Sequence, residues 1–180
     1  MKYDFTQART CIETLDKRRF DRALLGSGDA FRHIVSLVPL LLHLNHPALP
    51  GYVEDAPAGI ADFILSNYQQ NFLSKEHLEL AEDVQSAVNS DAVFAPILGI
   101  YVMGSFGSIS QTSASDLDIW ICHQDDLSEQ DQQRLAEKTK KISLWASTFH
   151  VEMHFYLMTQ KRFRNERYSD PLTKAVSYTH

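Results

Sequence analysis

Hydrophobic residues in the first half of the chain recur at helical spacing. Between residues 5 and 25, apolar side chains stand three or four positions apart with charged residues between them, which predicts an amphipathic helix. The apolar positions from Phe31 to Leu42 predict a second helix, which Pro39 could kink. Several prolines between residues 45 and 58 predict a loop. Less regular patterns favour two more helices, at residues 60–72 and 75–88.

The second half of the chain has the pattern of strands. Ile97–Met103 is a nearly continuous apolar run, which is typical of a strand buried on both faces. Leu117–Cys122 and Phe149–Met158 alternate between apolar and polar residues, which predicts two further strands. Between them, Ser128 followed by Asp131 predicts the start of a helix. The expected fold class is therefore α+β, with a small mixed β-sheet packed with N-terminal helices.

The first two helices are expected to cover this sheet. A sheet with only three strands needs helices against one of its faces to be stable. The apolar stripes of residues 5–15 and 31–42 are the surfaces available for this contact. We therefore expect both helices to pack on the sheet as one unit and to leave its polar face open.

Composition and charge exclude several classes of protein. The chain has 180 residues, of which 44% are hydrophobic and 22% charged, so it can bury a core without disulfides. A net charge of −6 argues against nucleic-acid binding through bulk positive charge. No apolar run is long enough to span a membrane and no secretory signal is visible, so we expect a cytoplasmic protein.

Candidate chemistry is concentrated between the first two predicted strands. Gly104 and Ser105 directly follow the first strand, where small residues let the backbone approach a ligand closely. The Gly-, Ser- and Thr-rich loop that ends at Ser115 offers N–H and hydroxyl donors to phosphate. Asp116 and Asp118 are two residues apart on the second strand, so both point to the same face. Paired carboxylates together with substrate phosphates are typical of Mg²⁺ sites.

A third carboxylate, Glu152, lies on the polar face of the last predicted strand and could complete this cluster. His150, Glu152 and His154 share that face, so a Zn²⁺ site is an alternative. Ligands at every second residue of one flat strand rarely converge on a single ion, so a catalytic role for Glu152 is favoured. An ordinary exposed face is the remaining alternative.

The order of these residues resembles a known motif. A hydrophobic residue, Gly-Ser, a spacer of about ten residues and then Asp-hydrophobic-Asp-hydrophobic is the pattern of the DNA polymerase β-like nucleotidyltransferase superfamily. Longer segments look like the N-terminal catalytic region of bacterial class I adenylate cyclases. These segments are Asp21–Leu24, Ser36–His43, His46–Tyr52, Tyr101–Ser105, Ser115–Gln124 and Arg162–Arg164.

The resemblance implies an enzyme that converts ATP to 3′,5′-cyclic AMP and pyrophosphate. The triphosphate of ATP would bind at Gly104, Ser105 and Ser115. Asp116 and Asp118 would hold Mg²⁺ for two-metal catalysis. Glu152 would hold a metal ion or accept the proton of the ribose 3′-hydroxyl. Members of this family are several times longer, so we expect a truncated chain and regulatory partners that act through the missing C-terminal region.

On this interpretation, residues 1–93 form a helical N-terminal segment, residues 94–167 an incomplete nucleotidyltransferase-like core, and residues 168–180 an unassigned tail. Whether the chain is active alone stays open. One alternative is another nucleotidyltransferase that acts on a protein, RNA or small-molecule acceptor. A second alternative is an inactive nucleotide-binding module. The motif does not separate these alternatives, because all of them share the same metal and phosphate contacts.

Overall fold

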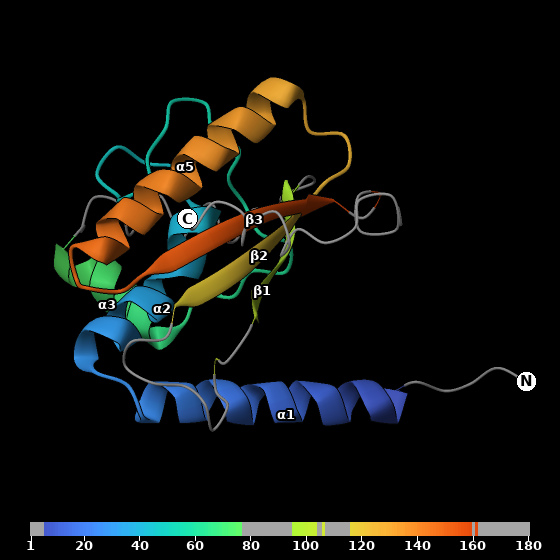
Figure 1. Cartoon of the computed structure of the whole chain (residues 1–180), viewed down its shortest axis with the longest axis vertical. Coiled ribbons are helices and arrows are strands. Elements are labelled where there is room, and N and C mark those ends of the chain that lie inside the picture. Colours follow the sequence, from blue (N-terminus) through green and yellow to red (C-terminus); the bar gives the residue numbers. More distant parts are fainter. Residues whose placement is uncertain (1–5, 77–94, 104–105, 107–115, 160, 162–180) are drawn as a thin grey trace, which may run out of the picture.

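The computed structural model describes residues 6–76, 95–103, 106, 116–159 and 161. The described helices and strands, shown in Figure 1, are α1 (Thr6–Leu25), α2 (Asp29–His43), α3 (Asn67–Glu76), β1 (Ile97–Met103), β2 (Leu117–His123), α5 (Glu129–Ser147) and β3 (Met153–Thr159). The predicted α+β class is confirmed. None of the described helices is both long enough and apolar enough to cross a bilayer.

The described strands form one mixed sheet in the order β1-β2-β3. Strands β1 and β2 are antiparallel, whereas β2 and β3 are parallel. Parallel neighbours need a long crossover connection, and α5 supplies it. The predicted start of this helix is confirmed, because the Ser128 hydroxyl accepts a hydrogen bond from the backbone N–H of Asp131 at 3.1 Å.

Strand β3 begins at Met153, four residues later than the sequence pattern predicted. The preceding residues complete the end of α5 instead. His150 has a φ of 60°, and the N–H of Val151 donates to the carbonyl of Ala146, which closes the helix in a Schellman-type turn. The prediction that residues 149–152 belong to the strand is therefore wrong.

The core lies on one face of the sheet. Leu117, Ile119 and Ile121 of β2 are buried there in the same cluster as side chains from α2 and α5. The buried members of these two helices are Ile34, Val35, Leu37, Val38, Leu40, Leu41, Leu42, Leu135, Ile142 and Ala146. The expectation that the stripe of residues 31–42 is buried is thus confirmed.

Helix α1 does not cover the sheet, contrary to the prediction. Ile12 and Leu15 are 58% and 52% exposed, and Ala23 is the only residue of α1 that is buried. Figure 1 shows α1 below the sheet and joined to the rest of the fold near its C-terminal end. Residues of α2 and α5 instead supply the apolar side chains that share the core cluster with the sheet.

Strand β1 is also less buried than its apolar sequence predicted. Ile97 is buried, but Leu98 and Tyr101 are 46% and 57% exposed. The apolar pattern predicts a strand buried on both faces, which is typical of the middle of a parallel sheet. Here β1 pairs antiparallel with β2 and lies at the edge of the described sheet.

The helix predicted at residues 60–72 begins later than expected. Ile60 forms an isolated bridge with Ile97, and α3 starts only at Asn67. The bridge explains the difference, because an extended segment that pairs with the start of β1 cannot be helical. Most of the helix predicted at residues 75–88 lies outside the described residues.

A buried lysine joins α5 to the loop that follows α2. Lys138 is 1% exposed, and its ammonium donates to the carbonyl of Leu44 at 2.7 Å and to Oδ1 of Asn45 at 3.1 Å. The Asn45 amide in turn donates to the carbonyl of Val53 at 2.7 Å. The loop predicted from its prolines is therefore held in place by side chains, because buried polar groups need such partners.

Burial lowers the pKa of Lys138 from 10.5 to about 8. The folded-state pKa lies below the unfolded one, so the unfolded chain binds more protons and stability rises as pH increases between about 8 and 10.5. We predict that the free energy of unfolding of the wild type rises relative to Lys138→Met by at most about 3 kcal/mol over this range. The hydrogen bonds to Leu44 and Asn45 favour the ammonium and reduce this gain. Urea unfolding at several pH values measures the difference, and parallel pH profiles of the two proteins would contradict the prediction.

Candidate active site

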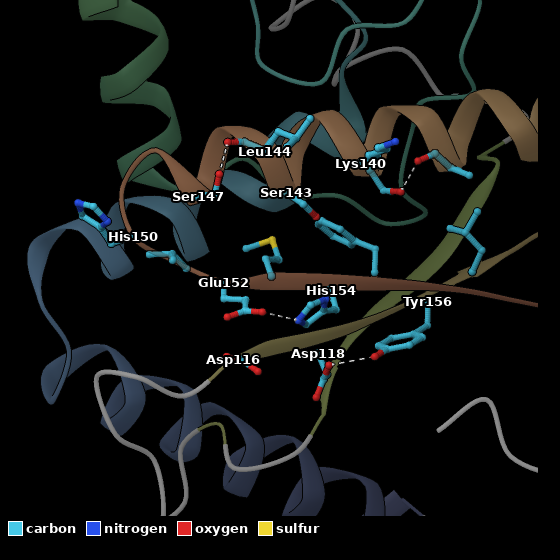
Figure 2. Close-up of a pocket in the computed structure, with 16 residues that line it drawn as sticks. Asp116, Asp118, Lys140, Ser143, Leu144, Ser147, His150, Glu152, His154 and Tyr156 are labelled. Atoms are coloured by element: carbon cyan, nitrogen blue, oxygen red, sulfur yellow. Dashed lines mark hydrogen bonds and ion pairs between the residues drawn. The ribbon is translucent and has the colours of Figure 1, made fainter. Parts of the chain in front are cut away.

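Strands β2 and β3 bring three carboxylates to the same face of the sheet. Because side chains alternate along β2, burying Leu117 on the core face places Asp116 and Asp118 on the opposite face. The backbone N–H of Leu117 donates to the carbonyl of Glu152 at 3.0 Å, and Asp118 pairs with His154. Neighbours in register share a face, so Glu152 lies beside the aspartates, as Figure 2 shows.

Two of these carboxylates lie close to the imidazole of His154. One ligand atom from each of Asp116, Glu152 and His154 lies within 4.8 Å of the other two, and all three residues are exposed. Nε2 of His154 is 3.3 Å from Oε1 of Glu152. A cluster of two carboxylates and one imidazole can hold a divalent cation, since each group offers a lone pair to the same point.

Asp118 stands next to this cluster with a partner of its own. Its Oδ1 accepts a hydrogen bond from the Tyr156 hydroxyl at 3.2 Å, which is drawn in Figure 2. Burial raises the pKa of Tyr156, and the negative charge of Asp118, their hydrogen bond and the charge of Asp116 raise this pKa further. The phenol therefore stays protonated around neutral pH and holds the Asp118 carboxylate in place.

A wide cavity of about 1210 Å³ runs from the carboxylates around β3 to α5. Asp116, Asp118 and Glu152 line one side of it, and Lys140 and Ser143 of α5 belong to the other, as Figure 2 shows. Because β3 is an outer strand of the described sheet, the cavity is open along that edge. The side chains of Asp116 and Glu152 are exposed on this side.

The sequence pattern located most of this arrangement. It placed Glu152 with the aspartates, and a carboxylate oxygen of Glu152 lies within 4.8 Å of one of Asp116. However, it grouped His154 with His150. His150 lies in the turn before β3 and apart from the carboxylates. The prediction that His150, Glu152 and His154 share one face of a strand is therefore wrong. The proximity of His154 to Asp116 was missed, although its alternation with Glu152 was a usable signal. Three predicted phosphate-binding residues, Gly104, Ser105 and Ser115, lie outside the described residues.

Comparison with known proteins assigns the chain to a family. Residues 4–179 match the family model described as Adenylate cyclase NT domain. This chain belongs to that family. The matched range of the cyclase family includes residues 168–179, most of the segment that the sequence pattern left unassigned.

Similar curated proteins are named adenylate cyclase. The protein of Haemophilus influenzae is 58% identical over 178 residues, which cover 96% of this chain and 21% of that protein. The protein of Pasteurella multocida is 51% identical over 175 residues, with coverages of 96% and 21%. The protein of Escherichia coli K12 is 37% identical over 155 residues, with coverages of 86% and 18%. The chain thus spans about a fifth of the length of its adenylate cyclase relatives. No solved structure matches it.

The contact between Asp118 and Tyr156 gives this cyclase-family site a measurable signature. We predict that Asp118→Asn lowers the pKa of Tyr156, because it removes a negative charge that favours the neutral phenol. NMR titration of ¹³C-labelled tyrosine measures this pKa, with Tyr156→Phe to assign the signal. Asp126→Asn, which removes an exposed carboxylate at the opposite end of β2, is the matched control. A Tyr156 pKa that is the same in Asp118→Asn and the wild type would contradict the prediction.

Proposed function

We propose that the whole protein is an adenylate cyclase, which forms 3′,5′-cyclic AMP and pyrophosphate from ATP, and that this chain supplies the metal-binding carboxylates. Membership of the family and the names of the relatives support the reaction. The observation that carries the site is the convergence of Asp116, Glu152 and His154. Asp118 lies beside them on the same sheet face.

The residues at this site fit Mg²⁺. Mg²⁺ prefers hard oxygen ligands and is commonly held by one or two carboxylates together with substrate phosphates. Asp116 and Asp118 are the proposed ligands, with Glu152 close enough to Asp116 to join them. When bound, two Mg²⁺ ions would stabilise charge on the attacking 3′-oxygen and on the pyrophosphate that leaves.

The protein groups around the metal ligands have separate proposed tasks. Tyr156 orients Asp118 through its hydroxyl. Glu152 is exposed beside His154, and its carboxylate is the proposed acceptor for the 3′-hydroxyl proton. Gly104, Ser105 and Ser115 are proposed to bind the triphosphate. Met103, the residue before Gly104, pairs with Asp118, so the chain leaves β1 next to the metal ligands.

We predict that Asp116→Asn or Asp118→Asn in the whole protein lowers cyclic AMP formation by at least about a hundredfold, because a neutral amide is a poor Mg²⁺ ligand. Chromatographic assay of cyclic AMP and pyrophosphate measures the rate, and thermal unfolding checks that each variant folds. Asp126→Asn serves as the control and should retain wild-type activity.

Two results would contradict this proposal. Wild-type turnover in either variant at the site would exclude the aspartates as essential metal ligands. Transfer of labelled AMP to a protein, RNA or small molecule, without cyclic AMP, would assign the protein to another class of nucleotidyltransferase.

We also predict that residues 1–180 alone bind Mg-ATP weakly and form cyclic AMP at a few per cent of the rate of the whole protein or less. The physical reason is that Asp116, Glu152 and His154 are exposed, and a metal site in contact with bulk water holds its ion weakly. Isothermal titration calorimetry with Mg-ATP and a cyclic AMP assay test this expectation. Turnover comparable to that of the whole protein would show it to be wrong.

A further inference from the structure

Asp116, Glu152 and His154 offer two kinds of ligand atom from two neighbouring strands. Asp116 directly precedes β2, Glu152 directly precedes β3, and His154 is the second residue of β3. One ligand atom of each lies within 4.8 Å of the other two. Figure 2 shows the Glu152 carboxylate and the His154 imidazole facing each other on the same side of the sheet as Asp116. We call these three side chains the mixed-ligand cluster, because they combine two carboxylates with one imidazole.

The spacing inside the mixed-ligand cluster matches that of ligands on a zinc ion. Carboxylate oxygen and histidine nitrogen bind Zn²⁺ at about 2.0–2.2 Å, and the geometry is usually tetrahedral. Two ligand atoms of such a tetrahedron are therefore about 3.3–3.5 Å apart. Nε2 of His154 and Oε1 of Glu152 are 3.3 Å apart. Asp116 is exposed, so rotation of its side chain can bring its carboxylate to the same point.

The imidazole distinguishes this cluster from a site for Mg²⁺. Mg²⁺ prefers oxygen ligands, whereas imidazole nitrogen suits zinc and other transition metals. Asp118, a proposed Mg²⁺ ligand, lies outside the cluster and accepts a hydrogen bond from Tyr156 instead. Asp116 and Glu152 serve both sets of ligands. An ion held through His154 would therefore occupy carboxylates that Mg²⁺ needs.

The cluster is open to ions from solution. Its three side chains are exposed, and all of them line the cavity that runs from the carboxylates to α5. Zinc sites with three protein ligands keep a further position for water, so complete enclosure is not needed. The two carboxylates also supply the negative charge that favours a divalent cation.

We propose that Asp116, Glu152 and His154 form a binding site for a divalent transition-metal ion of the Zn²⁺ type, which inhibits the enzyme by competing with Mg²⁺. The binding follows from the geometry of the cluster and does not depend on the reaction. The inhibition rests on the proposed function, because it takes Asp116 and Glu152 as residues that serve Mg-ATP.

Isothermal titration calorimetry of the nucleotide-free whole protein with ZnCl₂ tests the binding site. We expect His154→Ala to lower the Zn²⁺ affinity about tenfold or more, because it removes the nitrogen ligand. Glu152→Gln keeps the shape of its side chain but replaces the carboxylate with a neutral amide, and it should lower the affinity in the same way. Both side chains are exposed, so the melting temperature without zinc should match that of the wild type.

His150→Asn is the matched control. His150 carries an exposed imidazole four residues before His154 but lies apart from the carboxylates. Asparagine tolerates its φ of 60°. We expect His150→Asn to keep the wild-type Zn²⁺ affinity. The visible absorption of the Co²⁺-loaded protein should change in His154→Ala and stay the same in His150→Asn, because the bands depend on the ligands of the ion.

Cyclic AMP assays with added Zn²⁺ test the competition. We expect the Zn²⁺ concentration for half-inhibition to rise with the concentration of Mg²⁺. It should also rise about tenfold or more in His154→Ala, in line with the lost nitrogen ligand. The rate of each protein is compared with its own rate without zinc, at the same concentration of ATP.

The possible outcomes separate this inference from the proposed function. Equal Zn²⁺ affinity in the wild type, His154→Ala and Glu152→Gln would overturn the binding site, as would an equal loss in His150→Asn. Inhibition that does not depend on Mg²⁺ or on His154 would overturn the competition. If zinc binds through His154 while Asp116→Asn retains cyclic AMP formation, the proposed function fails and the zinc site stands. If Asp116→Asn abolishes cyclic AMP formation while His154→Ala binds zinc as the wild type does, only this inference fails.

Discussion

Strand β2 has one face in the apolar core and the other at the candidate site, and the rest of the structure depends on this division. Leu117, Ile119 and Ile121 are buried in the core, so the alternation of the backbone leaves Asp116 and Asp118 on the opposite face. A slip of one residue would bury the aspartates and expose the apolar residues, at a large cost in free energy. The same burial that stabilises the sheet therefore orients the carboxylates of the candidate site.

Helix α5 connects β2 to β3 and sets the position of β3 beside β2. It packs its apolar side in the core and is fixed to the loop after α2 through Lys138, whose ammonium has partners at Leu44 and Asn45. The turn at its C-terminal end, with His150 at a φ of 60°, then sets where β3 begins. Because β2 and β3 are parallel and in register, Glu152 arrives beside Asp116. Precise packing far from the carboxylates thus decides the geometry at the site.

The candidate site has exposed side chains, and one of its carboxylates is held in place by a hydrogen bond. Asp116, Glu152 and His154 are exposed and close together, which leaves them open to a cation and a nucleotide. Asp118 is held by the hydroxyl of Tyr156, whose pKa is raised by burial and by the neighbouring aspartates. Water screens the mutual repulsion of exposed carboxylates. Without a cation such a cluster is tolerable only near the surface, which is where the sheet places it.

The sequence by itself determined that β1, β2 and β3 are strands, the alternation of β2, and the spacing of Asp116 and Asp118, because these follow from local backbone geometry. The resemblance of its motifs to class I adenylate cyclases was confirmed by the family match. Only the tertiary structure decided that α1 is largely exposed, that β1 has open faces and that His154, but not His150, lies beside Asp116. Each of these depends on which surfaces compete for the core and on where a helix ends. Such contacts join residues far apart in the chain, and a pattern of neighbouring residues does not encode them.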